Sequence, residues 1–286
     1  MAALLYGLGA GIAWGLGDFA GALAARRIGA LWTSAAMQCV GAAGFAILLV
    51  GLGRWPVVTL PLVLWGLLLA AVGAGSLMLL YRGLALGPMA VVSPIGGAYA
   101  AVTVILAVLF LDERLTPLQT ALVGVTFAGV LLASTDLRLL VATLGRPSPG
   151  VRVGFVAMVG FGVWGLLLAL AVRSFDGLAI VLVSRFAGAA LMLGVVLLRR
   201  APPPSDRRRG TLGLVLAVGV FDTIANVSYV LGFETGYASI VATAGALYPV
   251  VTAALAILLL RERLAPNQYV GVGVLVCGLI GLGLAG

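Results

Sequence analysis

The chain has 286 residues, of which 63% are hydrophobic and 9% are charged, and its formal net charge is +8. A soluble globular protein carries roughly 25% charged residues, so this composition excludes a water-soluble domain and indicates a membrane protein. All basic residues are arginine and histidine is absent, which excludes lysine Schiff bases, histidine-dependent triads and histidine-ligated metals. We therefore expect no enzyme, no metal site and no cofactor. Because the arginines lie between apolar runs, we expect no nucleic-acid partner either.

Uncharged apolar runs of about 18 or more residues predict membrane-spanning helices. The first such run has no basic segment before it, so we expect no cleaved signal peptide. The predicted fold class is an all-α polytopic membrane protein. Its ten transmembrane helices are predicted near residues 3–24, 31–52, 60–81, 89–111, 117–135, 152–173, 177–198, 211–233, 238–260 and 267–285.

A longer connection near residues 134–152 divides the predicted helices into two groups of five. The predicted organisation is a first five-helix repeat at 1–137, a linker at 138–151 and a second five-helix repeat at 152–286. A second long connection at 199–210 is rich in proline and arginine, and we expect it to stay outside the bilayer.

The stretch "FLDERLTPLQ" from Phe110 returns as "LLRERLAPNQ" from Leu259, which indicates a duplication. Setting Tyr99 against Tyr248 aligns the two copies without gaps, and they share the run Glu-Arg-Leu-x-Pro-x-Gln. A unit with an odd number of spans starts its second copy from the opposite side of the membrane. The copies are therefore predicted to be inverted, as in transporters that expose a central site alternately to each side.

The repeated motif itself is predicted to be structural. Pro117 and Pro266 suit the first turn of a helix, where a missing N–H costs nothing. We expect Glu113 and Glu262 to mark tight turns at the membrane interface rather than to act in catalysis.

The Trp-Gly pair of the first helix, the run "SPIGGAYAAVTVILAVLFLDERLTPLQTALVGVTFAGVLL" at 93–132 and its second copy resemble the EamA-type members of the drug/metabolite transporter superfamily. The resemblance covers nearly the whole chain. It implies ten helices in two inverted repeats around a central cavity, and export of amino acids, other small metabolites or drugs. One proline departs from the pattern, because Pro94 of the first copy is displaced to Pro249 in the second. This displacement predicts different helix-break positions in the two halves.

Ionisable groups inside membrane spans are costly and usually mark a pathway. Asp222, Asn226 and Tyr229 are spaced i, i+4, i+7 and so share one helix face, and Arg185 lies well inside another predicted span. We expect Arg185 to bind an anionic group such as a carboxylate, and Asp222 to bind an amine or take up a proton. The alternative is an Asp222–Arg185 ion pair that only locks two helices together.

Asp18 lies four residues after Trp14 and close to Arg26, so it is either a cavity residue or a cap near the interface. Tyr99 with Tyr248, and Trp14 with Trp164, are pairs related by the repeat, and such rings either line a cavity or pack in the bundle. Gln38 and Arg185 also correspond through the repeat. The predicted substrate-binding residues are Trp14, Asp18, Gln38, Tyr99, Trp164, Arg185, Asp222, Asn226, Tyr229 and Tyr248.

Arginines near the predicted helix ends favour one side of the membrane. Only Arg54, Arg114 and Arg173 fall on the other side. The positive-inside rule then places both termini outside the cytoplasm, whereas the resemblance implies termini inside. The expected location is a bacterial-type cytoplasmic membrane. The arginines predicted on the more basic side of the membrane are Arg26, Arg27, Arg138, Arg146, Arg152, Arg199, Arg200, Arg207, Arg208, Arg209, Arg261 and Arg263.

The leading functional prediction is a secondary transporter that exports a small amphipathic metabolite, such as an amino acid, by alternating access. A proton-coupled multidrug exporter is the alternative, and it would need an acidic residue without an arginine partner. A channel or a lipid scramblase is a further alternative. The expected partners are a small-molecule substrate, the lipid bilayer and, for a coupled mechanism, protons. We expect a monomer or a weak oligomer.

Overall fold

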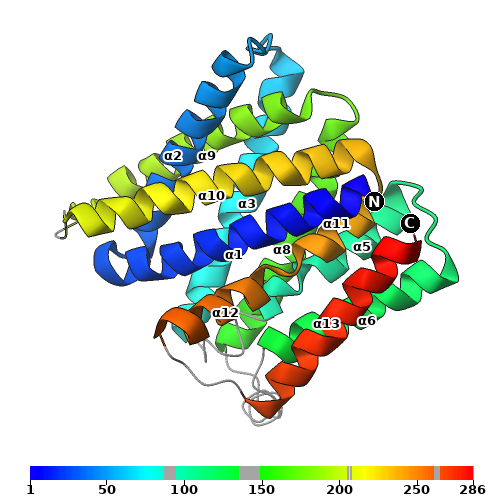
Figure 1. Cartoon of the computed structure of the whole chain (residues 1–286). Coiled ribbons are helices and arrows are strands. Elements are labelled where there is room, and N and C mark those ends of the chain that lie inside the picture. The colour runs from blue at the N-terminus through cyan, green and yellow to red at the C-terminus, as the bar shows by residue number, and fades with distance from the viewer. Residues whose placement is uncertain (87–94, 135–148, 205, 207, 261–264, 286) are drawn as a thin grey trace.

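The structure is a computed structural model that describes residues 1–86, 95–134, 149–204, 206, 208–260 and 265–285 (Figure 1). Within these ranges the chain forms helices and no strand. The helices are α1 (Ala2–Ile28), α2 (Ala30–Gly51), α3 (Leu60–Leu86), α5 (Tyr99–Phe110), α6 (Pro117–Ser134), α8 (Pro149–Val172), α9 (Gly177–Leu198), α10 (Arg209–Thr235), α11 (Ala238–Gly245), α12 (Tyr248–Leu260) and α13 (Pro266–Ala285).

The helices match the spans predicted from hydropathy. The described residues include 6 helices long and apolar enough to cross a membrane, together with four shorter apolar helical segments. The prediction of an all-α polytopic membrane protein is confirmed. Some of the predictions concern residues that the structure does not describe. These residues are 89–94, which include Pro94, 138–148, Arg207, Arg261, Glu262 and Arg263.

The predicted helix 238–260 is broken in two, because Ala246 and Leu247 form a turn between α11 and α12. In the first repeat a turn at the equivalent residue, Ala98, comes directly before α5. Both of these turns therefore precede a tyrosine of the matched pair. The prediction of different helix-break positions rests on Pro94, which lies outside the described residues, so it stays a prediction. Pro249 lies in the first turn of α12, where proline is accommodated without breaking the helix.

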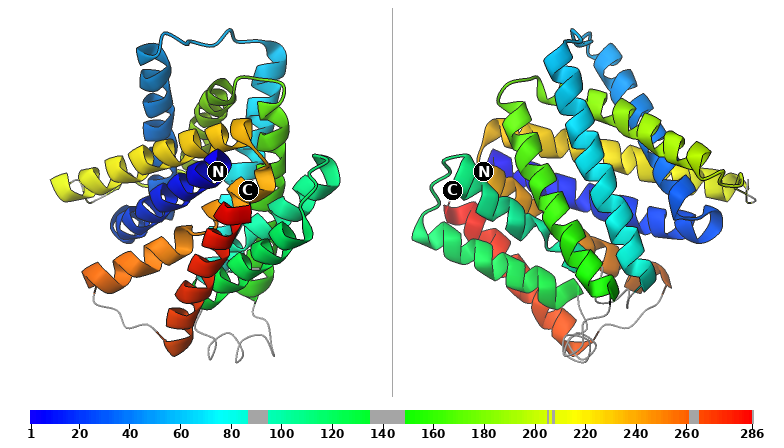
Figure 2. Two further views of the ribbon diagram at one scale, coloured as in Figure 1. Left: turned by 45° about the vertical axis from the view of Figure 1, so that its right-hand side comes forward. Right: turned by 180° about the vertical axis from the view of Figure 1, so that it is seen from behind.

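The two repeats pack together with two-fold symmetry. Exchanging α1 with α8, α2 with α9, α3 with α10 and α6 with α13 converts the α1–α10 contact into the α8–α3 contact. The same exchange leaves the α2–α9 and α6–α13 contacts in place. Figure 2 shows the α6–α13 pair on one flank of the bundle and the α2–α9 pair on the other.

The equivalent helices run antiparallel. Arg54, just after the end of α2, forms an ion pair with Asp176, just before the start of α9. Gln119, at the start of α6, donates from Nε2 to the carbonyl of Ala285 at the end of α13, at 3.4 Å. Because equivalent helices point in opposite directions, the repeats are inverted, as the odd number of spans predicted.

The repeated glutamine of the motif has the same two roles in both copies. Gln119 accepts from the backbone N–H of Thr116 at 3.0 Å, which caps α6. Gln268 accepts from the N–H of Ala265 at 2.8 Å and donates to the carbonyl of Ala133 at 3.2 Å. Each glutamine thus caps its own helix and binds the end of the equivalent helix in the other repeat.

The α6–α13 pair approaches too closely for larger residues at two matched glycines. A Cβ atom on Gly129 would lie 2.3 Å from the backbone nitrogen of Leu275. One on Gly278 would lie 2.5 Å from Oγ1 of Thr126. Small residues at such crossings let helix backbones meet in lipid, where hydrophobic driving force between helices is absent.

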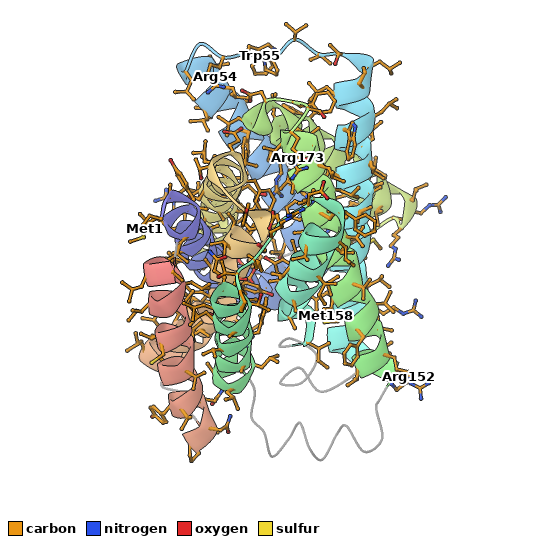
Figure 3. The ribbon with its side chains drawn as sticks, turned by 90° about the vertical axis from the view of Figure 1, so that its right-hand side faces the viewer. Met1, Arg54, Trp55, Arg152, Met158 and Arg173 are labelled. Carbon is orange, nitrogen blue, oxygen red and sulfur yellow. The ribbon has the colours of Figure 1, made fainter. Side chains whose placement is uncertain are left out.

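Two names are used below for the ends of the bundle. The terminal end is where α1 begins and α13 ends, and it carries Arg54 and Arg173. The arginine-rich end is where α1 ends and α10 begins, and it carries Arg26, Arg152 and Arg199. Figure 3 shows Arg54 and Trp55 at one end of the bundle and Arg152 at the other.

Candidate functional site

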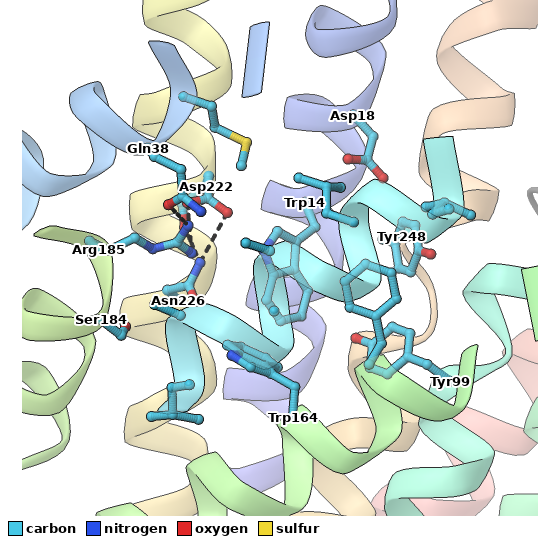
Figure 4. A pocket seen from close by; sticks show the side chains of 18 residues that line it. Trp14, Asp18, Gln38, Tyr99, Trp164, Ser184, Arg185, Asp222, Asn226 and Tyr248 are labelled. Carbon is cyan, nitrogen blue, oxygen red and sulfur yellow. Dashed lines mark hydrogen bonds and ion pairs between the residues drawn. The ribbon is translucent and has the colours of Figure 1, made fainter. Parts of the chain in front are cut away.

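A cavity of about 200 Å³ lies where the two repeats meet, with walls from helices of both copies (Figure 4). Nine of the ten residues predicted from the sequence line it, and their part in substrate binding stays a prediction. These nine are Trp14, Asp18, Gln38, Tyr99, Trp164, Arg185, Asp222, Asn226 and Tyr248.

One side of the cavity carries a buried ion pair between α9 and α10. Nη2 of Arg185 lies 2.9 Å from Oδ2 of Asp222, and each side chain is 11% exposed. Nη1 of Arg185 donates to Oε1 of Gln38 on α2 at 2.9 Å. Nδ2 of Asn226 donates to Oδ1 of Asp222 at 3.1 Å. The cluster therefore joins three helices, and removing either Arg185 or Asp222 alone would leave the other charge buried without compensation.

A second carboxylate, that of Asp18 on α1, is exposed to the cavity. It has no hydrogen bond or ion pair with any residue that the structure describes. Figure 4 shows it apart from the cluster of Arg185 and Asp222, across Trp14. Asp222 is paired with Arg185, whereas the Asp18 carboxylate has no cationic partner among the described residues. Such a group can bind a cation or a proton.

Aromatic rings form much of the remaining wall. The ring centroids of Tyr99 and Tyr248 lie 6.3 Å apart, and those of Tyr99 and Phe161 lie 6.0 Å apart. The matched residues Trp14 and Trp164 both line the cavity. Rings at these positions can stack on an organic molecule or hold a cation over a face.

Tyr229 is the predicted residue that does not line the cavity. It is fully buried, with its ring 4.9 Å from that of Trp14 and 4.4 Å from that of Phe233. It also stacks on Trp164 at 6.5 Å. Because Tyr229 lies two turns beyond Asp222 toward the terminal end of α10, this aromatic cluster fills the bundle between the cavity and that end.

Glu113 binds the second repeat at the terminal end. Its carboxylate is buried in the turn between α5 and α6 and accepts from the N–H of Ala238 at 2.6 Å and of Ser239 at 3.0 Å. The hydroxyl of Ser239 donates to the same carboxylate. Glu113 is thus an N-terminal cap of α11 supplied by the other repeat. This agrees with its predicted structural role, but the partner could not be read from the sequence.

The cavity extends instead toward the arginine-rich end. Leu77 and Leu80 in the second half of α3 line it, as does Asp18 in the second half of α1. The Tyr229 cluster lies on the terminal side of the cavity, and Glu113 joins the two repeats at that end.

The wall contributed by α3 was missed by sequence reasoning. Its residues recur at helical spacing and so share one face of the helix. They are as apolar as residues that face lipid, so the sequence cannot distinguish a cavity-facing side from a lipid-facing side. Phe161 and Ser184 were also missed. The α3 residues are Leu69, Ala70, Gly73, Ala74, Leu77 and Leu80.

Comparison with known proteins agrees with this geometry. A family model described as the EamA-like transporter family matches residues 1–135 and 148–284. A solved crystal structure, whose description names no function, is similar to this chain with a TM-score of 0.78 and 18% sequence identity. The match covers 99% of this chain and 97% of the other chain. At this identity the likeness concerns the fold alone. No curated protein matches the chain. The chain belongs to the EamA-like transporter family of the drug/metabolite transporter superfamily, and it is a multi-pass membrane transporter.

Proposed function

We propose that the cavity binds the substrate of a secondary transporter that works by alternating access. The observation that carries the proposal is the Asp18 carboxylate, which faces a cavity between inverted repeats and has no partner among the described residues. A site at such a junction can be exposed to either side when one repeat rocks against the other. A carboxylate held there attracts a positively charged group.

The proposed substrate is a small amphipathic metabolite with an amine group, such as an amino acid. Asp18 receives the amine, and the rings of Tyr99 and Tyr248 pack against the apolar body. A guanidinium has more N–H donors than the contacts of Arg185 to Gln38 and Asp222 use, so Arg185 can also bind a substrate carboxylate.

This proposal moves the amine from Asp222 to Asp18. The sequence-based prediction gave the amine or a proton to Asp222, but Arg185 and Asn226 already bind that carboxylate. Asp222 is therefore proposed as a positioning residue that holds the guanidinium of Arg185 at the cavity wall.

A proton-coupled multidrug exporter is the second candidate. Asp18 favours this candidate, because such an exporter needs an acidic residue without an arginine partner. Among the described residues, no arginine forms an ion pair with Asp18. The volume argues against it, since about 200 Å³ is smaller than the roughly 300–1,000 Å³ of pockets that hold drug-sized ligands. A small metabolite fits better. Proton coupling through Asp18 is compatible with either substrate.

Export is the proposed direction, in a bacterial-type cytoplasmic membrane. The positive-inside rule places the arginine-rich end in the cytoplasm and both termini outside. The cavity extends toward that end, so a cytoplasmic substrate would have access to it in this conformation. A reporter that is active only in the cytoplasm, fused to the C-terminus, should therefore be inactive. If this fusion is active, the C-terminus lies in the cytoplasm and the proposed orientation is wrong.

Counterflow in proteoliposomes tests the proposal. The purified protein should exchange a labelled amino acid for an unlabelled one, with saturation, and should ignore the matching carboxylic acid without an amine. Flux that never saturates would instead favour a channel or a scramblase. Equal flux of amine-bearing and amine-free compounds would contradict the proposal that Asp18 binds the substrate amine.

A further inference from the structure

A second cavity opens at the arginine-rich end, between α2, α3 and α9. Its volume is about 690 Å³, and of the described residues that line it only Leu77 also lines the central cavity. Its charged lining residues are arginines, whereas those of the central cavity include Asp18 and Asp222. The lining side chains that matter below are Leu31, Ser34, Met78, Arg82, Met192 and Arg199.

Two arginines lie at the outer part of this cavity. Arg82 is in the last turns of α3, and Arg199 follows directly after the end of α9. Both side chains are exposed, and neither forms an ion pair with the residues described in the structure. Acidic residues are absent from the described lining of this cavity. The site therefore has positive charge available for an anion.

The inner part of the cavity is apolar, with a single buried hydroxyl. Leu31, Met78 and Met192 form its walls. Oγ of Ser34, in a residue 4% exposed, has no hydrogen-bond partner among the described residues. Gly75 lies two helical turns below Arg82, and a Cβ atom there would have no heavy atom within 4 Å. A rise of about 1.5 Å per residue makes the cavity about 10 Å deep from Arg82 to Gly75.

This profile matches a phospholipid. Arginines at a helix end lie at the depth of the headgroups, and about 10 Å below them lie acyl chains. A soluble anion would use the arginines but not the apolar walls, whereas an anionic phospholipid uses both. We propose that this cavity binds one anionic phospholipid of the leaflet at the arginine-rich end. The phosphate binds Arg82 and Arg199, and an acyl chain fills the space beside Gly75.

The proposed lipid contacts a helix that also lines the central cavity. Leu77 belongs to both walls, so a bound lipid packs against the back of α3 in the conformation seen here. A ligand that binds one state stabilises that state. Anionic lipid is therefore expected to stabilise the conformation in which the central cavity extends toward the arginine-rich end. This inference does not depend on which substrate the protein carries.

Thermal unfolding of the purified full chain in a neutral detergent tests the proposal, with phosphatidylglycerol, phosphatidylcholine or inorganic phosphate added. Phosphatidylglycerol should stabilise the wild type at a concentration at least about tenfold lower than phosphatidylcholine does. Inorganic phosphate alone should have no effect. Equal stabilisation by both lipids, or by phosphate alone, would overturn the proposal.

Two variants locate the effect. Arg82→Gln/Arg199→Gln should reduce the preference for phosphatidylglycerol to less than about threefold. The control Arg26→Gln/Arg152→Gln, which removes two exposed arginines of the same end outside the cavity, should retain it. If both double variants lose the preference equally, the effect is a general surface charge and the site is wrong.

Gly75→Leu tests the acyl chain independently of charge. The new side chain enters open space and replaces glycine inside a helix, so the protein should fold at least as well as the wild type. It should also lose most of the stabilisation by phosphatidylglycerol, because leucine occupies the space proposed for the acyl chain. An unchanged lipid response in this variant would contradict the proposal.

Discussion

The α9–α10 side of the cavity and its α1 side each carry a carboxylate, in opposite circumstances. Asp222 is bound by Arg185 and Asn226 and is almost fully buried. Asp18 is exposed to the cavity and has no partner in the part of the chain that the structure describes. The difference separates a carboxylate that maintains the architecture from one that is available to a ligand. A list of intramembrane charges cannot make this distinction.

The largest expected effect is on the α9–α10 side. Arg185→Met leaves Asp222 buried without its cation, and we expect about 3–5 kcal/mol loss in the free energy of unfolding. Denaturation of the purified protein in detergent measures it.

A double variant is the matched control. Arg185→Met/Asp222→Leu removes both charges together, and it should recover most of the lost stability because no buried charge remains. If it is as unstable as Arg185→Met alone, the ion pair is not the cause of the loss.

The second prediction concerns the terminal end of the bundle, where Glu113 caps α11 from the other repeat. Glu113→Gln should weaken this contact between the two repeats. The change removes a charge that accepts from the N–H groups of Ala238 and Ser239. Hydrogen bonds to charged groups contribute about 1.5–3 kcal/mol, so unfolding should become easier by a similar amount. A cysteine introduced at the buried Ala242, in a background without Cys39 and Cys277, should react faster with a soluble thiol reagent.

Asp112→Asn is the control for Glu113. Asp112 lies in the same turn but is exposed, and its backbone has φ 57°, which asparagine adopts readily. Stability and labelling should stay as in the wild type. Faster labelling with Asp112→Asn as well would mean that general charge in the turn, rather than the cap on α11, keeps the terminal end closed.

The smallest expected effect concerns Asp206, a carboxylate outside the membrane that serves as a reference for the two in the cavity. The N–H of Arg208 donates to it at 2.9 Å and the hydroxyl of Thr211 at 3.0 Å, and these bonds lower the pKa of Asp206. A lowered pKa gives stability above the unfolded pKa that is lost as pH falls through the folded pKa. Asp206→Asn should slightly lower stability at neutral pH and leave transport unchanged. A difference from the wild type that persists below the folded pKa would contradict this cause.

The fold could be predicted because its signals are local or repeated. Apolar runs gave the spans, and the odd number of helices in each copy gave the inversion. The antiparallel contacts of Gln119 and Gln268 confirm the inversion. The break before Tyr248 was not predicted. Pro249 lies in the first turn of α12, and a proline in a first turn does not show where the preceding helix ends.

The candidate site could be predicted only where polar chemistry contrasts with lipid. Gln38, Arg185, Asp222 and Asn226 stand out in apolar sequence, and all four line the cavity. The wall of α3 gives no such contrast, because cavity-facing and lipid-facing residues are equally apolar. The sequence offered an Asp222–Arg185 ion pair as one of two alternatives, and the structure shows that this pair forms.

Counterflow kinetics of Asp18→Asn test the central claim most directly, with an amine-bearing substrate and its uncharged isostere in the same proteoliposomes. Loss of a charge-assisted contact should raise KM for the amine about tenfold or more, since about 1.4 kcal/mol corresponds to a factor of ten. The KM of any isostere that is carried, and the free energy of unfolding, should stay as in the wild type. An unchanged KM for the amine, or an equal loss for both compounds, would contradict the claim that Asp18 binds the transported amine.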